Sequence, residues 1–206
     1  MNTDRTIQTL SSFFLLDAAR ATEENLIYAT EKNENVISLY RGRSEESLSA
    51  VAPYIFTFPH SEDFSDFIMK NGWGRSWGVL VYSESDMDNL FKHFRKFLMV
   101  KTEEGKELYF RFYDPRVLRI FLPSCDAEQL KEFFGPVEKF IVEGDTKEEA
   151  VVFTLQDGEL QQSVISAAAV FGLSPASTLE EPPPGLAKKK RNTIIVIDDT
   201  PDDKEK

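Results

Sequence analysis

Residues 108–123, which read LYFRFYDPRVLRIFLP, constrain the fold of this chain more than any other stretch. Apolar and polar side chains alternate over residues 108–113, and many of them are aromatic, which predicts a half-buried strand. Asp114 then fits the N-cap of a helix, because its carboxylate can accept from the unpaired N–H groups of the first turn. Pro115 fits the first helical position, where a missing N–H costs nothing. The stretch therefore predicts a tight strand-to-helix junction.

Arginines bracket this junction, and two interpretations of them stay open. In the first, Arg111 and Arg116 form ion pairs with Asp114, and their role is to stabilise the strand-to-helix junction. In the second, Arg116 or Arg119 reaches the surface and contacts an acidic patch of a partner. The spacing alone does not separate the two.

Strand-like and helix-like segments alternate along the chain, which predicts an α/β fold. The strands are short and their connections vary, so we expect a mixed β-sheet with flanking amphipathic helices, in a single two-lobed domain. Expected strands cover residues 13–16, 36–40, 53–58, 77–82, 108–113, 140–143 and 151–155. Expected helices begin at Thr22, Ser44, Ser61, Asp86, Pro115 and Asp126, and a last helix carries Leu160, Val164, Ala168 and Phe171 on one face.

The domain boundaries follow changes in composition. Residues 1–12 form a polar N-terminal segment, residues 13–145 the main domain, and residues 146–173 its last strand and helix. Residues 174–206 are rich in Pro and charge and predict a flexible tail. The tail contains the aliphatic run Ile194, Ile195, Val196 and Ile197. This run has three possible fates: it folds back as a strand, adds a strand to a partner's sheet edge, or stays disordered.

Composition bounds the class of protein. The formal net charge of −11 argues against nucleic acid as the main partner, since neutralising phosphates needs clustered Lys and Arg. No run reaches the roughly 18 apolar residues that a membrane span needs, and the N-terminus lacks the pattern of a signal peptide. We therefore expect a cytoplasmic protein without membrane insertion.

Motifs that carry chemistry are scarce. The sequence has no HExxH, P-loop, GxGxxG or GxSxG pattern, so we expect no enzyme activity, no cofactor and no metal. Its single cysteine, Cys125, excludes an internal disulfide. A thiol-based site with His60 or His93 is the one enzymatic alternative. Trp73 and Arg75 lie in a glycine-rich turn, and an exposed Trp–Arg pair is typical of an interface.

The run from Arg111 to Phe140, RFYDPRVLRIFLPSCDAEQLKEFFGPVEKF, resembles the signature of the effector adaptor chaperones of bacterial type VI secretion. That family was long catalogued as a domain of unknown function. Three upstream blocks, residues 13–19, 39–56 and 77–100, are also similar to the family, in the same order. The matching signature residues are Arg111, Tyr113, Asp114, Pro115, Arg116, Gly135 and Pro136.

The resemblance implies a cytoplasmic adaptor of a Gram-negative bacterium. Such an adaptor binds a specific toxic effector and loads it onto the VgrG spike. The partners implied are therefore the effector and VgrG, and the candidate contact residues are Trp73, Arg75, Arg116, Arg119 and the run from Ile194 to Ile197. An immunity-like protein that binds and inhibits a toxin is the alternative.

Overall fold

Strand β1 (Ser11–Asp17) lies at the centre of the molecule and is buried on both faces. The computed structural model describes residues 10–41, 48–59, 61–101, 105–171 and 195–196. Phe13 and Leu15 point to one side of the sheet, whereas Phe14 and Leu16 point to the other. Successive side chains of a strand alternate between faces, so a strand covered on both faces needs a continuous apolar run. This explains the FFLL sequence and confirms the strand predicted there.

The main sheet has seven strands. Their order is β2 (Val36–Ser38), β3 (Pro53–Phe58), β1, β4 (Gly78–Ser83), β7 (Val137–Glu143), β8 (Glu149–Gln156) and β9 (Glu159–Ser166). Every described ladder is antiparallel. The predicted α/β class is confirmed, but the expected mixture of parallel and antiparallel pairs is replaced by an antiparallel sheet. β1 and β2 run in the same direction but lie on opposite sides of β3, and β3 and β4 likewise lie on opposite sides of β1, so each pair of neighbouring strands is antiparallel.

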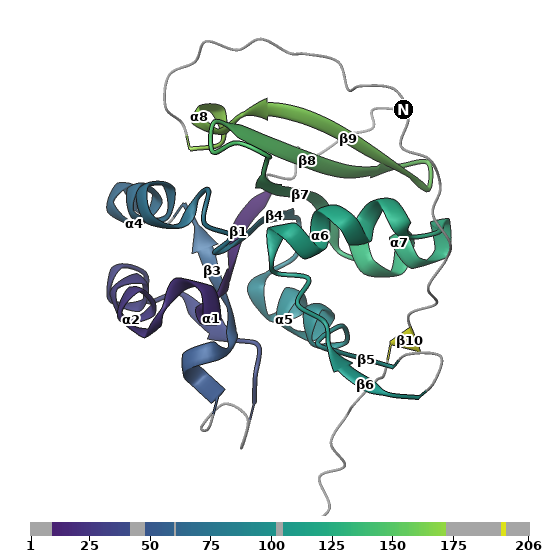
Figure 1. Ribbon diagram of the computed structural model, residues 1–206, viewed down its shortest axis with the longest axis horizontal. Helices are drawn as coiled ribbons and strands as arrows, with labels where there is room; N and C mark the ends of the chain where they lie inside the picture. Colours follow the sequence, from purple (N-terminus) through teal and green to yellow (C-terminus); the bar gives the residue numbers. More distant parts are fainter. Residues whose placement is uncertain (1–9, 42–47, 60, 102–104, 172–194, 197–206) are drawn as a thin grey trace, which may run out of the picture.

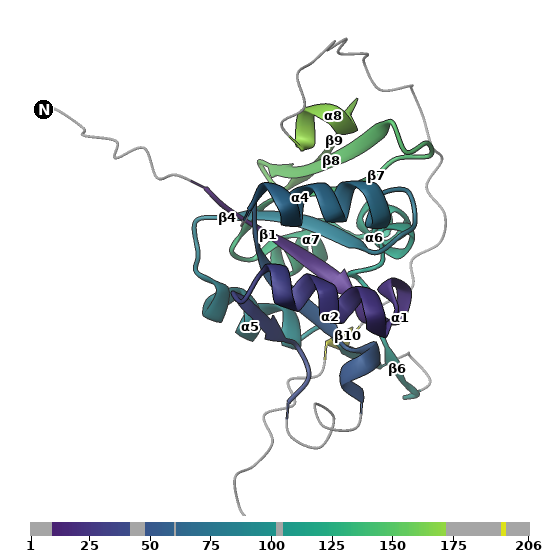
Figure 2. The same ribbon diagram turned by 90° about the vertical axis from the view of Figure 1, so that its left-hand side faces the viewer.

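Helices cover both faces of the sheet (Figures 1 and 2). One face carries α5 (Met87–Arg95), α6 (Pro115–Phe121) and α7 (Ala127–Phe134), with the single turn η3 (Leu122–Ser124) between the last two. The other face carries α1 (Ala18–Ala21), α2 (Glu23–Lys32), α4 (Glu62–Phe67), the π-helical turn η2 (Ile68–Gly72) and α8 (Ala167–Val170). The short turn η1 (Ser49–Val51) precedes β3.

Each face has its own aromatic core. Under α5 to α7, Phe94 stacks on Phe112 at 5.4 Å and Phe133 stacks on Phe140 at 5.4 Å between ring centroids. Under α2 and α4, Phe56 and Phe64 lie 5.3 Å apart. Phe64, Phe94 and Phe133, which come from three different helices, are almost completely buried in these cores.

Two predicted elements are wrong in extent or type. The strand predicted over residues 108–113 is only β6 (Glu107–Tyr109), because the chain turns at residues 112–113 and buries Phe112 and Tyr113 in the core. The predicted helix with Leu160 and Val164 on one face is strand β9 followed by the short helix α8. Residues four apart share a face in a strand as well as in a helix, so that spacing fits both. The turn Asp157–Gly158, with φ of 52° and 81°, decides for a hairpin.

A second, three-stranded sheet has the order β10 (Ile195–Val196), β5 (Met99–Lys101) and β6. Ile195 is opposite Lys101 and Val196 is opposite Val100, in antiparallel pairing. The centre of the aliphatic run thus folds back, although onto the small sheet rather than the main one. Ile194, Ile197 and the start of the helix expected from Ser44 lie outside the described residues, and the later part of that helix is the single turn η1.

Deletion of the residues after Gly185 tests this pairing. Because β10 contributes a ladder of only two residues, we expect a loss of roughly 1 kcal/mol or less in the free energy of unfolding. The bond from Phe110 to the carbonyl of Leu98 shows that Val100 faces β6 and Lys101 faces β10. Amide exchange should therefore accelerate at Lys101 and stay unchanged at Val100 and in β1. Unaltered exchange at Lys101 in the truncated chain would contradict the pairing.

Candidate functional site

Asp17 closes β1 and is the first member of a charged cluster at this end of the sheet. Its side chain is fully buried, accepts from the backbone N–H of Ala19 at 3.1 Å and thereby caps α1. The Arg111 guanidinium donates to its second oxygen. Burial raises the pKa of Asp17, and the bond from Arg111 only partly opposes that rise. The pair joins two segments that are 94 positions apart in the sequence.

Asp114 is the N-cap of α6, as predicted, and it holds Arg116. Its Oδ1 accepts from the backbone N–H of Arg116 at 3.0 Å, and Pro115 occupies the first turn. The Arg116 side chain binds the same carboxylate with both arms, at 3.0 Å from Nε and 2.6 Å from Nη2. Burial acts to raise the pKa of Asp114, but the bonds from Arg116 outweigh it and leave that pKa below its usual value.

Glu143 at the end of β7 supplies a third buried carboxylate. It accepts from the backbone N–H groups of Gly74 and Ser76, at 2.7 and 3.1 Å, and from the Ser76 hydroxyl at 2.9 Å. Ser76 has a φ of 60°, which non-glycine residues adopt at a cost. Three bonds to one carboxylate hold this turn in that conformation. Arg20 completes the arrangement by donating to the carbonyl of Arg75 at 3.3 Å.

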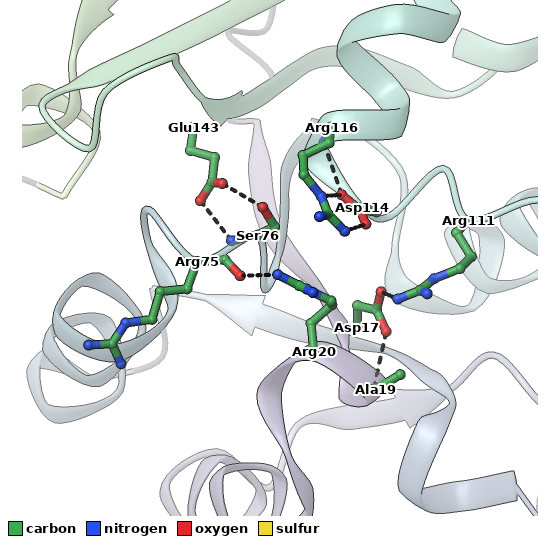
Figure 3. Close-up of polar contacts among 9 residues, drawn as sticks. All are labelled: Asp17, Ala19, Arg20, Arg75, Ser76, Arg111, Asp114, Arg116 and Glu143. Carbon is green, nitrogen blue, oxygen red and sulfur yellow. Dashed lines mark hydrogen bonds and ion pairs between the residues drawn. The ribbon is translucent and has the colours of Figure 1, made fainter.

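These residues form one site, which we call the arginine corner: Asp17, Arg20, Ser76, Arg111, Asp114, Arg116 and Glu143 (Figure 3). Its carboxylates are buried, whereas the side chains of Arg111 and Arg116 are 40% and 50% exposed. A guanidinium has five N–H donors, and the side-chain bonds among the described residues use one from Arg111 and two from Arg116. The corner therefore combines a structural role with outward donors suited to carboxylates. The expected pairing of Arg111 with Asp114 is wrong, because Arg111 binds Asp17, whereas the pairing of Arg116 with Asp114 is confirmed. The half-exposed Arg116 also fits the interpretation in which an arginine reaches the surface.

Sequence reasoning missed Asp17, Arg20 and Glu143. A carboxylate at the end of a buried apolar strand was the available signal, since FFLLD and FIVE both end in one. Such a group must find a partner when it is buried. The partner of Asp17 lies too far along the chain for spacing to reveal it.

The signature glycine has a steric reason. Gly135 ends α7 with a φ of 46°, and a Cβ there would lie 2.4 Å from Cε1 of His93. The Nε2 of His93 donates to the carbonyl of Phe133 at 2.8 Å, which holds the ring against the turn. The carbonyl of Pro136 accepts from the Ser83 hydroxyl at 2.6 Å and ties the same turn to β4. Gly135 and Pro136 are thus used for packing. The helix predicted to begin at Asp126 is confirmed, and Asp126 and Gln129 form a capping box at its start.

The remaining signature residue, Tyr113, is buried beside the corner. Burial raises the pKa of the Tyr113 phenol, with the neighbouring Tyr40 and Asp17 acting in the same direction, so this hydroxyl stays protonated.

The candidate contact residues are not brought together. Trp73 is 8% exposed and packs against Phe171 at 5.1 Å, so its prediction as an exposed interface residue is wrong. The aromatic core under α4 has room for this ring beside Trp77. Arg75 is exposed, and its side chain points away from the corner (Figure 3). Arg119 donates to Asp145 at 2.9 Å, one turn along α6 from Arg116.

The cysteine is not poised as a nucleophile. Burial raises the pKa of Cys125 to about 12, and its thiol donates to the carbonyl of Phe121 at 3.3 Å. A reactive cysteine needs the opposite shift. His93 is already bonded to Phe133, and His60 lies outside the described residues.

In the described part of the chain, no three His, Cys, Asp or Glu side chains form a group that could hold a metal ion. Within the same residues, no helix has the length and apolar character to cross a bilayer.

A model of the family described as "Domain of unknown function (DUF4123)" matches residues 12–132. The match covers more than half of the 206 residues, so the chain belongs to this family. It includes β1, β4 and the Asp17, Arg111, Asp114 and Arg116 members of the corner. No curated protein and no solved structure matches the chain.

Gly135→Ala is expected to destabilise the fold by roughly 2–4 kcal/mol, because a positive φ and a clash with His93 add to each other. Gly158→Ala is the matched control, since Gly158 also has a positive φ, of 81°, but nothing lies within 4 Å of its added Cβ. We expect about 1 kcal/mol there. Urea unfolding of both variants measures the difference. Equal losses would show that the His93 contact is unimportant.

His93 predicts a loss of stability in mild acid. Burial lowers the pKa of His93 below its usual 6.5, although the bond to Phe133 opposes that shift. The unfolded chain therefore binds the proton first, and stability falls as pH drops below about 6.5, by up to ~1.4 kcal/mol per pH unit. His93→Gln keeps a donor for Phe133 but does not titrate. Urea unfolding at pH 7.5, 6.5 and 5.5 should give a flatter profile for the variant, and parallel profiles would refute the assignment.

Proposed function

We propose that this chain is a cytoplasmic adaptor chaperone that binds a toxic effector and loads it onto the VgrG spike of a type VI secretion system. The observation that carries the proposal is the family match over residues 12–132, together with the four ordered sequence blocks that resemble those adaptors. The use of the signature residues adds support: Gly135 and Pro136 build a packed turn, while Arg111 and Arg116 combine buried pairing with exposed donors.

The arginine corner is the proposed contact surface for acidic side chains of a partner. Arg111 and Arg116 are anchored to buried carboxylates, so little conformational entropy is lost when they bind. Partly exposed arginines of this kind are typical of binding hot spots. The three arginines of the corner are balanced in charge by its three buried carboxylates, so what the corner offers a partner is the exposed part of two guanidinium groups rather than a net positive charge. An adaptor that passes the effector on to the VgrG spike binds it transiently, and a polar interface of small buried area suits such binding.

The test is co-purification of the full chain from its native cells, with identification of the proteins recovered. We expect a toxic effector and a VgrG protein among them, and the effector to remain in the producing cell when the chain is deleted. Recovery of neither partner with the full chain would contradict the proposal. Protection of a target cell from the purified toxin by this chain would favour the immunity-like alternative, because an adaptor alone does not give protection.

The corner itself is tested with Arg116→Ala. The variant removes two hydrogen bonds to the buried Asp114, so we expect a loss of roughly 1–3 kcal/mol in the free energy of unfolding. Affinity is therefore measured under conditions in which both variants are fully folded, and we expect binding of one partner to be at least about tenfold weaker. Lys131→Ala is the control. Lys131 is exposed on α7, whose end leads to Val137 opposite Ser83, at the far end of β4 from the corner. Equal affinities of the two variants would remove the corner from the interface while leaving the adaptor role open.

A further inference from the structure

Strand β9 forms one edge of the main sheet, and it is built differently from the other edges. It is eight residues long, whereas β2 at the opposite edge has three. Its ladder with β8 runs without a bulge from Gln156 opposite Glu159 to Glu149 opposite Ser166. Natural sheets protect such edges with lysine, proline, bulges or very short strands, and ELQQSVIS contains none of these.

The hairpin geometry identifies the backbone groups that face outward. The turn Asp157–Gly158 has two residues with positive φ, as in a type I′ hairpin, so its closing pair, Gln156 and Glu159, is hydrogen-bonded. Bonded and non-bonded pairs then alternate along the ladder. The far end agrees, because Ala167 donates to the carbonyl of Glu148 at 2.8 Å, in the same series. Leu160, Gln162 and Val164 therefore direct their N–H and C=O groups away from β8.

The two faces beside this edge differ in character. Leu160 and Val164 are partly exposed and pack against the core under α7. The opposite face presents Glu159, Gln161 and Ser163, all exposed. The hairpin from Asp145 to Ser166 contains five acidic residues and one lysine, at Asp145, Lys147, Glu148, Glu149, Asp157 and Glu159.

We propose that β9 is a strand-addition site for an extended segment of a partner protein, with apolar side chains on one face and basic side chains on the other. The apolar side chains would pack beside Leu160 and Val164, and the basic ones would lie over the polar face, close to Glu159 and to the acidic residues at the two ends of the hairpin. Main-chain hydrogen bonds to residues 160, 162 and 164 would provide affinity, and alternating side chains would provide specificity. A second copy of the chain is disfavoured as occupant by its charge of −11.

The site lies outside the family match, which ends at residue 132. This fits a surface that recognises a partner particular to this chain. If the partner is the effector that the adaptor carries, that identification rests on the proposed adaptor function. Strand addition to β9 itself does not rest on it. The experiment therefore uses a synthetic probe and requires no effector.

The probe is a nine-residue peptide of alternating Lys and Val, and the readout is amide hydrogen exchange resolved by residue. In the free full-length protein, the N–H groups of Leu160, Gln162 and Val164 should exchange fast, whereas those of Gln161 and Ser163 are already bonded to β8. The peptide should slow exchange of the first three by at least about tenfold at saturation. A peptide of the same composition with its Lys and Val in two blocks should leave them unchanged, as should one with Glu in place of Lys.

Two variants make the result specific. Gln162→Pro removes one outward N–H without touching a bond to β8, and an edge strand tolerates proline at such a position. Val164→Lys adds a charge that blocks edge pairing and serves if the proline variant does not fold. Each should weaken peptide binding at least about tenfold, whereas Gln161→Ala should not.

Three results would overturn the proposal. Protection of Leu160, Gln162 and Val164 in the free chain at every concentration would show that the chain covers its own edge. Protection that grows with protein concentration would show a second copy there. Absence of peptide protection at millimolar concentration, or equal protection by the block peptide, would show that the edge does not accept a strand. None of these results would affect co-purification with an effector and VgrG, so the two proposals fail separately.

Discussion

The burial of Asp17 is the constraint on which the corner depends. A carboxylate without solvent must be paired and hydrogen-bonded, and Asp17 meets this need from both sides of the sheet. It accepts from Ala19, at the start of α1, and from Arg111, just before α6. The Asp17 carboxylate at the end of β1 is thereby bonded to a segment from each face of the sheet. Removing one partner of such a pair costs far more than the pair itself contributes, so the position tolerates little change.

The family match ends at residue 132, and residues beyond that boundary complete the core and the arginine corner. Residue 132 lies within α7, yet the helices of residues 87–134 need apolar surface beneath them. Much of that surface comes from later strands, where Val137, Phe140 and Phe153 are buried in the same core. Glu143, which holds the turn at Ser76, also follows the boundary. The matched segment and strands β7 to β9 therefore form one cooperative unit, although they differ in how they relate to the family.

Local features of the fold were predictable because their causes are local. Asp114 and Asp126 cap helices within three residues of themselves, and Phe13 to Leu16 report two-sided burial directly. The errors have a different origin. Phe112 does not lie in the strand predicted for it, because it is buried in a core formed by three helices and the main sheet, which lies far from it in the sequence. The spacing of Leu160 and Val164 fits a strand as well as a helix. The arginine corner joins residues 17, 74–76, 111–116 and 143, so only the folded chain reveals that Arg111 belongs to Asp17 while Arg116 belongs to Asp114.

The two proposed contact regions share one end of the sheet. Asp17 ends β1, Glu143 ends β7 and Ser166 ends β9, and antiparallel order places these ends together. A strand added antiparallel to β9 would begin at this end, so the residues that precede it would emerge near the corner. Between three and five strand spacings separate an added strand from β7 and β1, or roughly 15–25 Å, which an extended chain spans in about five to eight residues. A single segment with acidic residues followed by an alternating basic and apolar strand would therefore fit both regions, which joins a site inside the family match to a site beyond it.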